Sequence, residues 1–175
     1  ASEKDITPDI KELIGRLNEK SKQPSHSDVM RYRLWLDQKY RSPYTGLTIP
    51  ISRLFTTDYE IEHVIPQSRY FDNSLTNKVI CESEVNKLKD NQLGYEFIMR
   101  HHGEKVPLSR GRTATILEPK EYEQLVKNTY SANPQKLKKL MMDDIPDGFI
   151  DRQLNDSRYI SKLVKGLMSK IVREK

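Results

Sequence analysis

A glutamate and a histidine are adjacent in the sequence, at Glu62 and His63, and Asn86 follows further along the chain. Carboxylate and amide oxygens are ligands that hard cations such as Mg²⁺ and Mn²⁺ prefer. A neutral imidazole, with an unperturbed pKa of about 6.5, can take a proton from water near neutral pH. Together with a metal ion that stabilises charge on the phosphorus and the leaving oxygen, these residue types suit phosphodiester hydrolysis. Without other information, however, a lone Glu-His pair on a strand more often lies exposed on the surface and has no catalytic role.

The segment that carries these residues reads as a strand, a loop, a strand and a short helix. The predicted bounds are 59–66 for the first strand, 67–76 for the loop, 78–81 for the second strand and 83–90 for the helix. Neighbours on a strand point to opposite faces, so Glu62 and His63 should do so. The helix can fold back over the strands and bring Asn86 toward Glu62. A unit this small must pack on flanking helices.

Flanking elements are predicted on both sides, and they make the expected fold α+β, a mainly helical domain around a ββα hairpin. Helices are predicted over about 8–19, 28–40 with Ser27 as its cap, 95–101, 119–130, from 134 onward, and 156–173. A short edge strand is predicted over 47–51 and a basic loop over 106–115. We expect Leu167, Ile171 and Val172 of the last helix to face a partner rather than this domain's core.

Composition narrows the class of protein. The chain has 175 residues, a length that indicates one domain, and 35% of them are hydrophobic and 31% charged. Its net charge of +5 indicates an anionic partner. It has no apolar run long enough to span a membrane and a polar start unlike a signal peptide. One cysteine, Cys81, excludes a disulfide scaffold and a thiolate zinc site and favours a reducing compartment. Arg110 and Arg112 could equally contact a phosphate backbone or lie in a solvated loop.

The chain resembles the HNH endonuclease motif, also known as the ββα-metal fold, and in particular the HNH domain of RNA-guided type II CRISPR effector nucleases. The matching segments are Tyr59–Ser68, Asp72–Ser74, Asn77–Val79, Asn86–Lys87 and Asp90–Asn91. A second block, Gly148–Leu154 followed by Arg158–Ile160, resembles the link from the HNH domain back into the RuvC-type domain of those effectors. Two blocks in this order are more specific than an HNH motif alone.

Roles for individual residues follow from the resemblance. It implies His63 as the general base and Asn77 as the residue that holds the loop and orients the histidine strand. It also implies Glu62 and Asn86 as ligands of one Mg²⁺, for which Mn²⁺ can substitute. The remaining implied roles are those of Glu84, which can approach the ion, and of Lys89, a candidate phosphate contact. The family commonly has aspartate where this chain has Glu62, and other HNH enzymes often have histidine where it has Asn86.

The resemblance also implies a domain organisation and a function. Residues 1–27 would be a linker helix and linker, 28–150 the HNH nuclease domain, and 151–175 a helix toward the RuvC-type domain. The domain would hydrolyse the target DNA strand paired with the guide RNA, in the prokaryotic cytoplasm, as part of antiviral defence and without a membrane partner. Two alternatives stay open at this point: a free-standing HNH nicking endonuclease, and a non-catalytic nucleic-acid-binding module of the same fold.

Overall fold

An antiparallel hairpin forms the centre of the structure, which is a computed structural model that describes residues 8–17, 23–149 and 165. Strand β1 (Tyr59–His63) pairs with β2 (Lys78–Glu82), with Tyr59 opposite Glu82 and His63 opposite Lys78. A second, smaller hairpin joins β3 (Lys105–Pro107) to β4 (Thr113–Thr115). The rest is mainly helical, so the predicted α+β class is confirmed.

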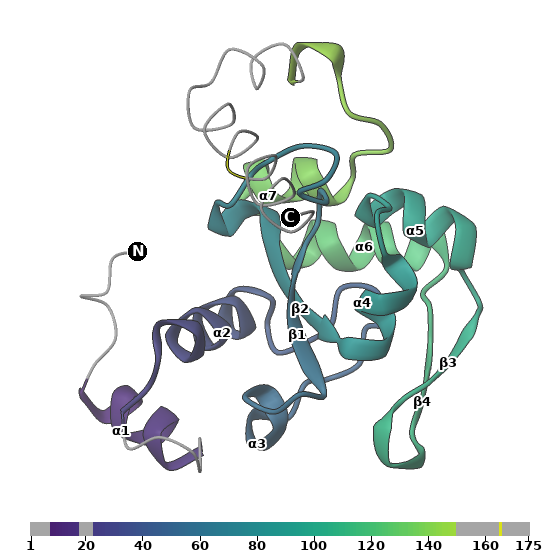
Figure 1. Ribbon diagram of the computed structural model, residues 1–175. Helices are drawn as coiled ribbons and strands as arrows, with labels where there is room; N and C mark the ends of the chain where they lie inside the picture. Colours follow the sequence, from purple (N-terminus) through teal and green to yellow (C-terminus); the bar gives the residue numbers. More distant parts are fainter. Residues whose placement is uncertain (1–7, 18–22, 150–164, 166–175) are drawn as a thin grey trace, which may run out of the picture.

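Helices surround the central hairpin, with α2 and α4 packed directly on it (Figure 1). Their bounds are α1 Pro8–Leu17, α2 His26–Asp37, α3 Ile51–Leu54, α4 Ser83–Lys89, α5 Gly94–His101, α6 Pro119–Thr129 and α7 Pro134–Leu140. The described residues also include the 3₁₀ turns η2 Leu75–Asn77 and η3 Ser109–Gly111. The order β1, loop, β2, α4 is therefore the predicted ββα unit.

The two faces of the hairpin contribute to different parts of the core. Ile80 joins a cluster with Leu34 of α2 and Leu54 of α3. Val79 and Cys81, its neighbours on β2, point the other way into the largest cluster, which α4, α5 and α6 complete. Because side chains alternate along a strand, Glu60 and Glu62 of β1 share the α4 face, and His63 lies on the opposite face, as predicted.

Three local predictions are wrong. The expected strand over 47–51 is an isolated bridge between Arg41 and Thr48 followed by α3, which begins directly after Pro50. The expected basic loop over 106–115 is the β3–β4 hairpin, in which Val106 and Ala114 pair and are buried. Helix α2 is capped by Ser25 rather than Ser27, because Asp28 and Ser25 bond reciprocally in a capping box.

The C-terminal predictions lie outside the described residues. The expected helix over 156–173, including Leu167, Ile171 and Val172, belongs to this part of the chain, from which only Lys165 is described. Within the described ranges, none of the helices is both long enough and apolar enough to cross a bilayer.

Candidate active site

His63 is the last residue of β1 and is partly buried. Its Nε2 lies 3.4 Å from Oδ1 of Asn73 and 3.2 Å from Nε2 of Gln67, both in the loop between the strands. Burial lowers the pKa of His63 below its usual value; the contact with Asn73 opposes this shift, and the nearby Lys78 ammonium adds to it. A lowered pKa favours the neutral imidazole, which is the state that a general base requires.

Asn77 is fully buried and ties both ends of the loop together. Its Oδ1 accepts a hydrogen bond from the Ile65 backbone N–H at 2.8 Å, and its Nδ2 donates to the carbonyls of Ile65 and Asp72, each at 3.0 Å. Its own carbonyl accepts from the Val64 N–H at 2.9 Å. These bonds hold the backbone directly after His63, which supports the loop-holding role expected of Asn77. Participation in catalysis stays a prediction.

Glu62 points into the core, where its carboxylate has two partners. One oxygen forms an ion pair with Nζ of Lys89, and the other accepts a hydrogen bond from the Tyr44 hydroxyl at 2.8 Å. The side chains of Glu62 and Lys89 are 3% and 1% exposed. Lys89 is therefore not placed to contact a phosphate in this structure.

The other predicted metal ligands face different partners. Asn86 donates from Nδ2 to Oε2 of Glu60 at 2.5 Å, at the solvent-facing side of the α4–β1 contact. Glu84 accepts from the backbone N–H of Ser109 at 2.9 Å. Glu62, Glu84 and Asn86 thus have oxygen chemistry that suits Mg²⁺ but do not converge on one point. Within the described part of the chain, no three or more His, Cys, Asp or Glu side chains form a group that could hold a metal ion. In this arrangement Glu62 is engaged by Lys89 and Tyr44, and Glu84 by Ser109, so the predicted ligands would form a metal site only after these contacts change.

Arg110 and Arg112 lie in and after the turn between β3 and β4. Arg110 is exposed and has a positive φ of 60°, whereas Arg112 is partly buried. A hydrogen bond with Tyr59 raises the pKa of Arg112, although burial opposes this shift. Since Tyr59 begins β1 and His63 ends it, Arg112 stands at the far end of that strand from the candidate base.

Sequence reasoning missed several side chains that shape the site. Tyr44 lies 18 positions before Glu62, in a turn whose Ser42 and Thr45 hydroxyls also bond the buried carboxylate of Glu82, at 2.7 and 2.6 Å. The signal available beforehand was the cluster of three hydroxyl side chains in one turn. Nothing in the sequence alone pairs them with the carboxylates.

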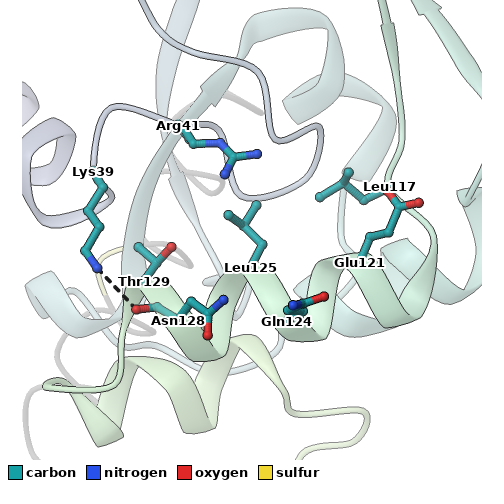
Figure 2. A pocket seen from close by; sticks show the side chains of 8 residues that line it. All are labelled: Lys39, Arg41, Leu117, Glu121, Gln124, Leu125, Asn128 and Thr129. Atoms are coloured by element: carbon teal, nitrogen blue, oxygen red, sulfur yellow. Dashed lines mark hydrogen bonds between the residues drawn. The ribbon is translucent and has the colours of Figure 1, made fainter.

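A separate cavity of about 380 Å³ lies between α6 and the chain segment after α2. Figure 2 shows Lys39 and Arg41 on one side and α6 side chains such as Leu125 on the other. Lys39 donates to the Asn128 carbonyl at 3.3 Å across this cavity. None of the predicted site residues lines it.

Comparisons with known proteins point to one family. Residues 42–95 match the family model of HNH endonucleases. The chain is 30% identical over 166 residues, 94% of its length, to the CRISPR-associated endonuclease Cas9 of Streptococcus mutans. It is 32% identical over 136 residues, 77% of its length, to Cas9 1 of Streptococcus thermophilus. It covers only 11% and 12% of those two proteins, and so spans about a tenth of their length.

Solved structures agree at the level of the fold. A crystal structure of Streptococcus thermophilus Cas9 in complex with the AGAA PAM superposes with a TM-score of 0.61 and 24% identity, covering 98% of this chain and 16% of that one. The Type II-C Cas9 of Actinomyces naeslundii gives a TM-score of 0.53 at 17% identity, covering 76% of this chain and 13% of that one. The family match, the curated relatives and the shared fold lead to one conclusion: the chain belongs to the HNH endonuclease family, in the form carried by Cas9 proteins.

Proposed function

We propose that this chain is the nuclease domain of an RNA-guided CRISPR effector and that it hydrolyses the DNA strand paired with the guide RNA. The observation that carries the proposal is the similarity to Cas9 proteins over 94% of the chain, together with the HNH family match over residues 42–95, a range that includes His63. The relatives are endonucleases by name, and the two alternatives, a free-standing nickase and a non-catalytic module, gain no support from them.

In the proposed reaction, His63 is the general base. Its neutral imidazole takes a proton from a water molecule as the water oxygen attacks the phosphorus. The bond from phosphorus to the 3′ oxygen breaks, the 3′ oxygen takes a proton from solvent, and the products carry a 5′-phosphate and a 3′-hydroxyl. Nε2 meets an acceptor on Asn73 and an amide donor on Gln67, so its protonation state decides which contact forms. Loss of the Gln67 contact would free an unprotonated Nε2 for water.

A divalent cation is the proposed cofactor, with Mg²⁺ preferred and Mn²⁺ able to substitute. HNH endonuclease domains are generally metal-dependent, and the predicted ligands Glu62, Glu84 and Asn86 offer oxygens only. Because these side chains do not converge, no step of the reaction is assigned to the ion. The expected outcome is that Asn86→Ala weakens the dependence of cleavage on Mg²⁺, with partial rescue by Mn²⁺, which tolerates varied ligands better.

The proposed partners follow from the resemblance to type II CRISPR effectors. Target DNA paired with a guide RNA would enter as the substrate, and residues 151–175 would lead toward a RuvC-type domain of the same effector. Residues 28–150 would form the nuclease domain and 1–27 a linker helix and linker. Sequence choice would lie with guide pairing, which fits a modest net charge of +5. The setting proposed is the prokaryotic cytoplasm, since the relatives are bacterial.

The direct test is a cleavage assay of the effector that contains this chain. His63→Ala should abolish cutting of the guide-paired strand while binding of DNA, measured by filter binding, stays within about twofold, because guide pairing supplies the affinity. His101→Ala is the matched control, since that histidine lies on α5 and bonds Glu104 instead. Near-normal cutting by His63→Ala would remove His63 from the mechanism.

A further inference from the structure

Lys89 is a fully buried lysine whose ammonium meets three acceptors. It pairs with Oε1 of Glu62 and donates to the backbone carbonyls of His63 at 3.0 Å and Val64 at 3.2 Å. An ammonium group has three N–H donors, so every donor of Lys89 has a protein partner. None is left for a phosphate oxygen unless one of these contacts breaks.

Two of those acceptors belong to the backbone around the candidate base. Lys89 is the last residue of α4, whereas His63 is the last residue of β1, 26 positions earlier. The lysine therefore ties the end of the helix to the end of the strand. On the other side of this backbone, Asn77 holds the N–H groups of Val64 and Ile65. The peptide units after His63 are thus fixed from both sides.

The remaining acceptor supplies the charge that keeps the lysine in place. Glu62 neutralises the ammonium, and the Tyr44 hydroxyl bonds the second carboxylate oxygen at 2.8 Å. Lys89 also lies 6.0 Å from the centre of the Tyr44 ring. A buried cation needs such a counter-ion, because an unpaired charge in the core costs several kcal/mol.

We infer that Lys89 is a positioning residue, which holds the His63 backbone, and that Glu62 and Tyr44 hold Lys89. This inference rests on the proposed role of His63 and replaces the phosphate contact expected for Lys89. Binding of DNA should then be independent of Lys89, while the rate of cleavage should depend on it. Small displacements of a catalytic group can lower a rate about 100-fold, so the effect on kcat is measurable.

The test compares Lys89→Met with Lys87→Met. Both changes remove one positive charge from α4, but Lys87 is exposed. In the effector that contains this chain, Lys89→Met should lower kcat for the guide-paired strand by about 10- to 100-fold, with an unchanged KM and an unchanged salt dependence of DNA binding. Lys87→Met should leave kcat within about twofold. A phosphate contact predicts the reverse for Lys89→Met, namely a raised KM, an unchanged kcat and a salt dependence weaker by about one counterion, and that result would overturn the inference.

A second readout needs neither DNA nor metal. In the 175-residue chain, the carbonyl ¹³C signals of His63 and Val64 and the ring signals of His63 should shift in Lys89→Met and stay in place in Lys87→Met. Unshifted signals would refute the positioning role of Lys89, whatever the kinetics show. Should the wild-type effector not cut the guide-paired strand, the proposed function fails, and the same signals still decide whether Lys89 holds His63.

Removal of the lysine alone leaves the Glu62 charge buried, and the single variant could fail to fold. The double variant Glu62→Gln/Lys89→Met removes both charges together and is compared with Glu62→Gln alone. The spectral differences between these two variants then isolate Lys89; cleavage rates are not compared, because Glu62 is itself a predicted Mg²⁺ ligand. The inference predicts shifted carbonyl signals of His63 and Val64 in the double variant relative to Glu62→Gln; equal signals in both would contradict it.

Discussion

Replacement of Asn77 by alanine should destabilise the domain strongly, because this side chain carries three hydrogen bonds in the core. Its loss leaves the N–H and the carbonyl of Ile65 without these partners, and Ile65 is fully buried. A buried polar group left unsatisfied costs about 1–3 kcal/mol, so two such groups give a loss of about 4 kcal/mol in the free energy of unfolding. For a domain of this size that corresponds to a fall in Tm of about 10 °C.

Urea denaturation of the 175-residue chain, followed by circular dichroism, measures this loss directly. Asn73→Ala is the matched control, since Asn73 lies in the same loop but is exposed and makes one 3.4 Å contact with His63. It should change stability by less than about 0.5 kcal/mol. A loss below about 1 kcal/mol for Asn77→Ala would refute the reasoning, because the loop would then be held by other contacts.

Other expected outcomes test separate parts of the structure. Burial lowers the pKa of His63, and Lys78 lowers it further, so cleavage should fall on acidification only below pH 6.5. Lys78→Met should move the midpoint of this pH profile upward. An unchanged midpoint would contradict the electrostatic reasoning. Thr45→Val removes one of two hydroxyl donors to the buried Glu82 carboxylate and should cost about 1.5–3 kcal/mol in urea denaturation, with Glu82→Gln in the same chain reducing the loss. Ser25→Ala should cost about 1 kcal/mol through loss of the α2 cap, and no change would show that the cap is dispensable.

The local elements of the site were predictable because their signals are local. Alternation over 59–66 predicts the strand, of which residues 59–63 form β1, and Pro119 at the start of α6 and Asn133 before α7 mark those helix starts. Strands of three residues, as in β3 and β4, are too short to show alternation, and the arginines between them favour a loop instead. The choice between Ser25 and Ser27 as a cap depends on Asp28, which completes a capping box only with Ser25.

The environment of Glu62 was not predictable in the same way. Strand alternation places it on the α4 face, but its two partners come from a turn 18 positions before and a helix end well after it. Whether the Glu62 face of β1 is exposed to solvent or buried in the core depends on how α4 and the turn that contains Tyr44 pack against it. This packing is a property of the whole fold. For the same reason the partner of Asn86 is Glu60 and not Glu62. Glu60 lies two residues earlier on the same face of β1 and is exposed.

The proposed role of His63 is that of the general base in cleavage of the guide-paired strand. The most direct measurement is a single-turnover assay of the effector that contains this chain, with both target strands labelled in the same reaction, for wild type and His63→Ala. The account predicts a rate for the guide-paired strand at least about 100-fold lower in the variant, as expected for loss of a general base, and an unchanged rate for the other strand. Equal rates for the guide-paired strand in the two proteins, or equal losses on both strands, would contradict it.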